Sequence, residues 1–286
     1  MRRLALVALV TLACGALPAH AQALSLAYKT GDTFKYTYHS TTRQTINAAG
    51  VTVPTNLDIS TAESVTVKSV DSSGTADLSI ALRNFTIKST TGGVTKTTTT
   101  GISPSTIDMT VAADGRVVGI NGNPYAGTNT FLTFTGMGSG FFVTAVLPAN
   151  AVKPGDTWSN SYDQAMPGGA GGIHMTSTSN YLRNESFNGI DAAVVETKSI
   201  GTIDISSALS TPQPGATNMG MAMKGTVATD VTTWIDPVGH RVLKTHATEI
   251  DDGTMNLHLP PEVGSVPGLG GPMTIQGSAT TDLTAA

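Results

Sequence analysis

Side chains capable of catalysis are present in this chain, but their spacing matches no catalytic motif. Ser139 lies among the glycines of positions 136–140, which do not have the Gly-x-Ser-x-Gly spacing of a nucleophile elbow. The six histidines are scattered and form no His-Glu-x-x-His zinc motif. The carboxylates are isolated on polar faces, so a hydrolase would need acidic residues that meet only in the folded chain. We therefore predict that the protein is not an enzyme, and keep such a hydrolase as the third-ranked alternative.

Three methionines alternate along one segment of the chain. Met219, Met221 and Met223 would point to one face of a strand, and thioether sulfurs are suitable ligands for Cu(I). Such a row also makes an adaptable lining for a hydrophobic ligand, because methionine fills irregular space. We favour the lining and predict neither a metal nor another cofactor. Further on, Asp251-Asp252-Gly253 lacks the spaced carboxylates of a calcium loop and predicts a hairpin tip.

Phenylalanine is concentrated in the middle of the chain. Four of the seven phenylalanines lie between Asn129 and Pro148, at helical spacing, with Asn129 as the expected N-cap and Pro148 as the stop. This pattern predicts a short apolar helix that packs on the concave face of a sheet, either as a core plug or as a lid. Together with the methionine row, it defines the predicted ligand-binding residues: Phe131, Phe134, Met137, Phe141, Phe142, Met219, Met221 and Met223.

The first residues have the pattern of a secretory signal peptide. A basic start, Met1–Arg3, precedes the apolar run Leu4–Ala16, and Ala19-His20-Ala21 forms a small-x-small cleavage site. We predict cleavage after residue 21 and export to the periplasm or the extracellular space. The apolar run is too short to span a membrane, so no transmembrane segment is expected after cleavage.

The single cysteine, Cys14, falls within this predicted signal peptide. An alternative interpretation makes Cys14 the lipid-anchored first residue of a lipoprotein, but Leu12 stands one position too close to it for that signal. On the favoured interpretation the mature chain contains no cysteine, which excludes disulfides and thiolate chemistry.

The composition of the chain limits the classes of partner that we expect. The 286 residues include 16 basic and 20 acidic side chains, for a net charge of −4, so no basic stripe for nucleic acid is expected. Only 13% of the residues are charged whereas 40% are hydrophobic. Threonine, serine and glycine supply much of the remaining chain, as is typical of β-rich exported proteins.

Apolar residues alternate with polar ones over most of the chain. Ala76, Leu78, Ile80 and Leu82 share one parity, which indicates a strand with one buried face. The apolar parity changes after Leu82, so we expect a β-bulge near Arg83–Asn84. Repeated turn signals separate about ten such segments and predict an antiparallel meander; these signals are Asp71–Gly74, Gly92-Gly93, Asp114-Gly115, Asn188-Gly189 and Asp252-Gly253.

Short repeated motifs suggest an internal duplication. Gly31-Asp32-Thr33 recurs as Gly155-Asp156-Thr157, and Gly115-Arg116-Val117 is echoed after nearly the same interval by Gly239-His240-Arg241-Val242. We predict a mainly β protein of two tandem antiparallel meanders, joined as one large curved sheet or half-barrel or kept as two domains, with the short apolar helix between them. The predicted boundaries are a signal peptide at 1–21, a first half at 22–123, a connector at 124–154 and a second half at 155–286.

Two short motifs carry a resemblance to known proteins. Leu147-Pro148 followed by Pro154-Gly155-Asp156-Thr157-Trp158, together with the hairpin Asp236–Arg241, resembles a group of uncharacterised secreted bacterial proteins over roughly residues 25–260. The expected curved sheet with a helix on its concave side is distantly similar to the LolA-like periplasmic lipoprotein carriers. That resemblance implies an apolar groove for acyl chains without catalysis or metal, although this chain is twice as long as one carrier domain.

The sequence thus favours an exported, non-enzymatic protein that binds a lipid or another hydrophobic small molecule in a concave β-sheet groove. The main alternative is a structural or protein-interaction module of the cell envelope, with a packed core and an envelope protein as its partner. A ligand-sized hollow would favour the first hypothesis, and a solid core the second.

Overall fold

The computed structural model describes residues 21–99, 106–120, 123–124, 144–165, 169–209, 219–258 and 272–286. Every regular element among them is a β-strand, and the strands are β1 (Thr33–Ala48), β2 (Val51–Val70), β3 (Ala76–Thr91), β4 (Val94–Thr99), β5 (Thr106–Val111), β6 (Val117–Ile120), β7 (Asn123–Pro124), β8 (Thr157–Ala165), β9 (Gly169–Phe187), β10 (Ile190–Leu209), β11 (Met219–Asp236), β12 (Arg241–His258) and β13 (Pro272–Ala285).

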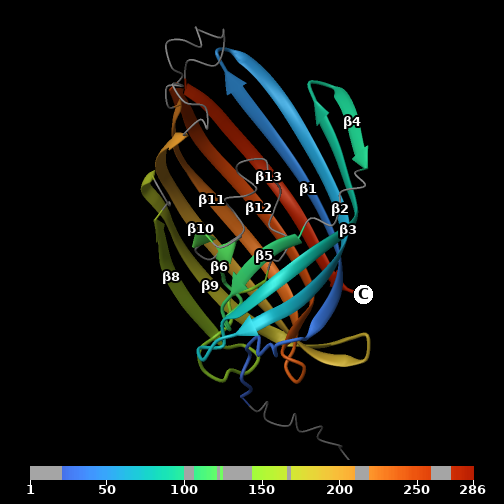
Figure 1. The fold of residues 1–286 in the computed structure, drawn as a ribbon. Helices are drawn as coiled ribbons and strands as arrows, with labels where there is room; N and C mark the ends of the chain where they lie inside the picture. Colours follow the sequence, from blue (N-terminus) through green and yellow to red (C-terminus); the bar gives the residue numbers. More distant parts are fainter. Residues whose placement is uncertain are drawn as a thin grey trace, which may run out of the picture.

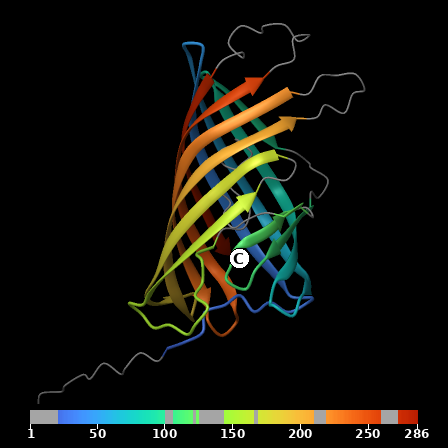
Figure 2. The ribbon, with the colours of Figure 1, turned by 90° about the vertical axis from the view of Figure 1, so that its left-hand side faces the viewer.

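These strands form one antiparallel sheet in the order β7-β6-β5-β3-β2-β1-β13-β12-β11-β10-β9-β8, with β4 paired to β3. The first and last strands pair at its centre, where Tyr36–Ala48 of β1 face Met273–Ala285 of β13. Strands of both predicted halves therefore belong to a single sheet. The sheet curls strongly about its own axis, as Figures 1 and 2 show. The predicted mainly β fold with one large curved antiparallel sheet is confirmed.

Alternation determines which face of the sheet is buried. On β3, Ala76, Leu78, Ile80 and Leu82 are at most 7% exposed and point to the concave side. On β1, Tyr36 and Tyr38 occupy the same side, while the intervening threonines and lysine face outward. A period of two thus produces an apolar concave face and a polar convex face, because successive side chains of a strand point in opposite directions.

The predicted bulge and most of the predicted turns are confirmed. The pairing of β2 with β3 shifts register where Ala62 faces Arg83 and Ser60 faces Thr86, and Asn84 has a φ of 54°. The β9–β10 hairpin turns at Asn188 and Gly189, both with positive φ, as a two-residue primed turn requires. The tip predicted at Asp252-Gly253 is wrong, because both residues lie within β12 and pair with strands on either side.

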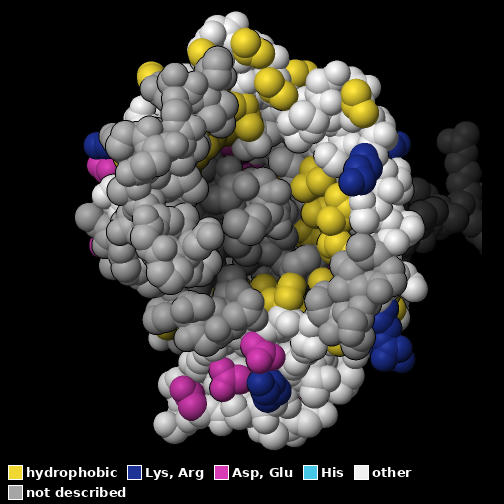
Figure 3. Space-filling view, turned by 45° about the horizontal axis from the view of Figure 1, so that its top comes forward, with side chains coloured by type: hydrophobic (Ala, Val, Ile, Leu, Met, Phe, Trp, Pro, Cys, Tyr) yellow, Lys and Arg dark blue, Asp and Glu magenta, His cyan; other side chains and the backbone are white. Residues whose placement is uncertain are grey.

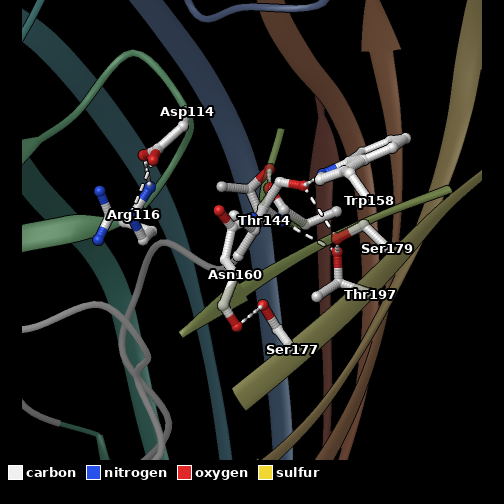
Figure 4. A network of polar contacts seen from close by, with 10 residues as sticks. Asp114, Arg116, Thr144, Trp158, Asn160, Ser177, Ser179 and Thr197 are labelled. Atoms are coloured by element: carbon white, nitrogen blue, oxygen red, sulfur yellow. Dashed lines mark hydrogen bonds and ion pairs between the residues drawn. The ribbon is translucent and has the colours of Figure 1, made fainter. Parts of the chain in front are cut away.

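The predicted helix between the two halves is not seen where the structure describes that segment. Thr144–Pro148, the end of the predicted helix, has no regular secondary structure, and the remainder lies outside the described residues. The buried N–H groups of Ala145 and Val146 donate to the hydroxyls of Thr233 (2.8 Å) and Thr197 (3.0 Å) instead of to helical carbonyls. In Figure 4, Trp158, Ser179 and Thr197 gather beside this segment.

This segment and the chain's N-terminal stretch close one end of the curved sheet. Leu24, Leu26 and Leu147 are at most 2% exposed and belong to the main core, and Gln22 pairs with Val152 in an isolated bridge. The N-terminal stretch runs beneath the strands in Figure 1. The main core therefore occupies the closed end of the molecule.

The two Gly-Asp turns have the same hydrogen bonds. Asp32 Oδ2 accepts from the N–H of Lys29 at 3.1 Å, and Asp156 Oδ2 accepts from the N–H of Lys153 at 2.9 Å. Gly31 and Gly155 have φ values of 92° and 94°. The N–H of Gly31 donates to the carbonyl of Val67 on β2, the hairpin partner of β1, and the N–H of Gly155 donates to the carbonyl of Tyr181 on β9, the hairpin partner of β8. Equivalent local structure is what a duplicated motif would produce.

Candidate binding site

A second apolar cluster lies on the concave face, away from the main core. Its buried members come from the five strands β8 to β11 and β13, near the ends of those strands that are opposite the closed end. They are Tyr162, Ile173, Met175, Ile203, Ile205, Met223, Val227 and Ile275, with the partly buried Ile46 and Met255 beside them. Figure 3 looks toward this end and shows a hollow whose inner wall carries hydrophobic side chains. We call this group the upper cluster.

A row of mainly polar side chains separates the upper cluster from the main core. Strand register places the members of this row side by side across β9, β10, β11, β12, β13 and β1: Ser177, Ser199, Thr229, Glu249, Ala279 and Thr42. Ser177, Ser199 and Thr42 are at most 6% exposed, so these hydroxyls are held inside the molecule. The concave wall is therefore amphipathic along its length, apolar at both ends and polar between them.

Asp251 stands at the boundary between this polar row and the upper cluster. It is 3% exposed and pairs with Val227 on one side and Gly277 on the other. Its Oδ2 atom has no hydrogen-bond partner among the described residues. Burial, with a smaller contribution from the Asp252 carboxylate, raises the pKa of Asp251 to about 6. A buried carboxylate without a partner is costly, and it favours a donor or a cation beside it.

Glycines on three neighbouring strands make room for this arrangement. Gly225 of β11 faces Gly253 of β12, and Gly277 of β13 faces Asp251. A Cβ atom at Gly277 would lie 2.5 Å from Asp251 Oδ1 and 2.7 Å from Oδ2. The carboxylate therefore lies against the bare backbone of β13, a position that any other residue at 277 would obstruct.

A second buried carboxylate, Glu63, lies in the main core and not in the upper cluster. It is 3% exposed, and neither of its oxygens has a hydrogen-bond partner among the described residues. Burial raises its pKa to about 9, so the side chain is protonated at neutral pH. Its neighbour Tyr36 donates to the carbonyl of Val242 at 3.0 Å. Glu63 is thus a neutral core residue at neutral pH.

Three strand histidines, His39, His174 and His246, lie on the convex face, each beside an aspartate. His39 lies 3.3 Å from Asp58, and His246 lies 2.8 Å from Asp282, with side chains that are 42–51% exposed. His174 and Asp163 form a similar pair on β9 and β8. Among the residues that the structure describes, no three histidine, cysteine, aspartate or glutamate side chains are grouped to hold a metal ion.

A depression of about 570 Å³ lies at the closed end, between the Pro148–Val152 segment and the first half of β8. Two of its polar groups have structural partners. The indole N–H of Trp158 donates to the carbonyl of Val146 at 2.9 Å, and Asp156 accepts from the N–H of Lys153.

The structure describes only part of the predicted ligand-binding set. Met223 is 1% exposed and belongs to the upper cluster. Met219 and Met221 share strand β11 with it, at the same parity, but their side chains lie outside the described part. The remaining predicted residues, Phe131, Phe134, Met137, Phe141 and Phe142, also lie outside the described residues.

The sequence prediction missed Asp251 and the isoleucines of the upper cluster. Asp251 was assigned to a hairpin tip, where it would be exposed. The sequence does contain a signal for the inward position of Asp251. If the alternation is extended through Gly253, Asp251 and Glu249 have the same parity as Met255 and Leu257.

No family model and no curated protein matches the chain. Among solved structures, it is similar to a lipovitellin structure described for its lipid–protein interactions, with a TM-score of 0.44 and 13% sequence identity. The similarity covers 90% of this chain and 25% of the lipovitellin chain, so this chain spans a quarter of that protein. A likeness of this degree says nothing about the ligand of this chain. Within the described residues, no helix is long and apolar enough to cross a membrane.

Proposed function

We propose that this protein is an exported, non-enzymatic binding protein that holds a lipid or another hydrophobic small molecule against the concave face of its sheet. The observation that carries the proposal is the upper cluster. It is a second apolar surface on the concave wall, separated by polar side chains from the core that stabilises the fold. Small apolar clusters apart from the main core also occur under long loops, and we assign this one to a ligand because it lies beside the hollow and next to the polar row.

The two faces of the sheet support this function in different ways. The convex face carries ion pairs such as Lys224–Asp204 at 2.9 Å and Lys198–Asp230 at 3.3 Å, which keep it compatible with water. The concave face supplies the isoleucine, methionine and valine side chains of the upper cluster, against which the hydrophobic part of a ligand would pack. Apolar binding in a hollow and solubility outside are the properties of a carrier.

Binding of the neutral fluorophore Nile red tests this function. The purified protein should bind the dye with a blue-shifted emission that saturates, because the dye leaves water for an apolar wall. Ile205→Thr should weaken this binding about fivefold, since it removes roughly 1 kcal/mol of apolar contact. Threonine retains the β-branched shape that the strand accepts, so the variant should remain folded.

The matched control is Ile200→Thr on the same strand. Ile200 points to the convex face and is 65% exposed, whereas Ile205 is 2% exposed. Ile200→Thr should therefore leave dye binding unchanged. Absence of saturable binding to the wild-type protein, or equal weakening by the two substitutions, would contradict the proposal.

One observation favours the alternative of a protein-interaction module. Ile200, Ala228 and Ile250 are register partners on the convex face, and the two isoleucines are 65% and 66% exposed. This small apolar row could contact an envelope protein. If Ile250→Thr abolished a specific complex recovered from cell envelopes while dye binding was absent, the interaction module would become the better description.

A further inference from the structure

We propose that the hollow selects amphiphiles with a positively charged head, and that Asp251 on β12 is the residue that holds the head group. This inference rests on the proposed function, because it names the chemical class of ligand for the same site. The class is a protonated amine joined to a hydrophobic tail. The head would contact the Asp251 carboxylate, and the tail would lie along the upper cluster.

The position of Asp251 on the wall supports this choice. Val227, a member of the upper cluster, is its direct cross-strand partner on β11. Ile275, another member, lies two residues from Gly277, the partner of Asp251 on β13. On the other side of Asp251, the next residue of β12 that faces inward is Glu249, within the polar row. A ligand with one polar end could therefore place that end at Asp251, beside the polar row, and its apolar part along the upper cluster.

The local geometry leaves Asp251 available for a ligand. Its Oδ2 atom has no hydrogen-bond partner among the described residues although the residue is 3% exposed. The missing side chain at Gly277 lets the carboxylate lie against β13. Its register partners are a valine and a glycine, which cannot neutralise it. The one lysine of the paired strand β11, Lys224, has the opposite parity and bonds outward to Asp204.

The charge of the site selects the sign of the head group. The pKa of Asp251 is raised to about 6 by burial and by Asp252, so most molecules carry a carboxylate there at pH 7.5. A carboxylate inside the protein attracts an ammonium group and repels an anionic one more strongly than it would in water. A fatty acid anion would therefore be disfavoured relative to a neutral or cationic amphiphile of equal length.

Three amphiphiles with the same tail and different heads test the proposal without any substitution. Dodecylammonium, dodecanol and dodecanoate are titrated at pH 7.5, below their aggregation concentrations, by displacement of Nile red. Dodecylammonium should bind at least about tenfold more tightly than dodecanol, as expected for a hydrogen bond to a charged group. Dodecanoate should bind more weakly than dodecanol.

Substitution then assigns the preference to one residue. Asp251→Asn should reduce the ratio of dodecylammonium to dodecanol affinity to about one and leave dodecanol binding unchanged. Asp252→Asn is the matched control, because Asp252 is the adjacent residue on the exposed convex face, bonded to Gln276 at 3.0 Å. It removes the same formal charge and should preserve the ratio.

The outcomes separate the two proposals. Binding of dodecanol with no preference for dodecylammonium would overturn the head-group assignment and leave the proposed function intact. Failure of all three amphiphiles to bind would overturn both. A preference that survives in a folded Asp251→Asn protein, or that is lost equally in Asp252→Asn, would show that the general charge of the chain and not Asp251 determines the selection.

Discussion

Two carboxylates, Glu63 and Asp251, are buried on the same face of the sheet in different surroundings. Glu63 lies among the tyrosines and aliphatic residues of the main core, where only burial acts on it, and its pKa rises to about 9. Asp251 lies at the edge of the upper cluster, and its pKa rises to about 6. At neutral pH the first is therefore a neutral core group and the second is a charged one. This difference is why Asp251, and not Glu63, is assigned to a ligand.

Glu63 should make the stability of the protein depend on pH. Its folded-state pKa of about 9 lies above the ordinary value of 4.5, so its stabilising contribution is complete below about pH 4.5 and is lost as the pH rises toward 9. The free energy of unfolding should fall across this window with a slope that approaches about 1.4 kcal/mol per pH unit. Glu63→Gln should remove that slope in urea unfolding measured from pH 5 to pH 9.

The exposed Glu185, which is bonded to Arg183, provides the control for this experiment. Glu185→Gln should retain the wild-type slope. If Glu63→Gln unfolds with the same pH dependence as the wild-type protein, the buried and protonated state assigned to Glu63 is wrong.

The burial of Glu63 could be predicted from the sequence, whereas its pKa could not and the position of Asp251 was mispredicted. Glu63 has the parity of Val65 and Val67 on β2, so its burial could be predicted from alternation. Its pKa could not, because that depends on Tyr36 and other residues distant in sequence that remove water from it. Asp251 was mispredicted because Asp-Gly is a strong local turn signal, which the pairing of β12 with two neighbouring strands overrides.

At the scale of elements, glycine explains both a misprediction and the curvature of the sheet. Gly225 and Gly253 face each other on the concave side of β11 and β12, where side chains would meet as the sheet curls. Glycines placed in this way are a usual means of bending a sheet. Gly189, by contrast, forms the hairpin that its sequence predicts, because its φ of 81° serves a true turn. Sequence alone does not separate these two uses of glycine.

The glycines of the concave face should differ in their tolerance to alanine. A Cβ atom at Gly225 would lie 2.5 Å from the backbone oxygen of Asp252 and 2.9 Å from the Cα atom of Gly253, neither of which can move freely. Gly225→Ala should therefore cost about 1–3 kcal/mol of unfolding free energy. Gly277→Ala should cost less, because it meets only the end of the Asp251 side chain.

Urea unfolding of the two variants measures this difference. A Gly225→Ala protein as stable as the wild type would contradict the close approach of β11 and β12. A Gly277→Ala protein less stable than Gly225→Ala would contradict the described position of the Asp251 side chain.

In the connector between the two halves, tertiary contacts override the local sequence pattern. Its spacing predicts a helix up to Pro148, but Ala145 and Val146 are not helical, and hydroxyls of Thr233 and Thr197 accept their N–H groups. Those partners come from strands 51 and 88 residues away in sequence, so no local pattern could reveal them. A tertiary contact of this kind determines the conformation of a short segment regardless of its own periodicity.

At the scale of the whole molecule, the sheet divides its interior into a closed end and a hollow end. Leu24, Leu26 and Leu147 fill the closed end together with the aliphatic residues of β2 and β3. The upper cluster lines the wall at the other end, where Figure 3 shows the hollow. The fold class and the sidedness of the strands follow from alternation. The pairing of β1 with β13, which joins the two halves, has no local signature because it connects the ends of the chain.

The central claim is that the hollow holds a hydrophobic or amphiphilic molecule, and the most direct measurement is the mass spectrum of what the native protein carries. The protein is purified without detergent, and a native mass spectrum is compared with that of its organic-solvent extract. The expected result is one amphiphile per chain, released by the solvent, with a basic nitrogen in its head group. A native mass equal to that of the bare polypeptide, from a protein that also fails to take up Nile red or dodecylammonium, would contradict the account.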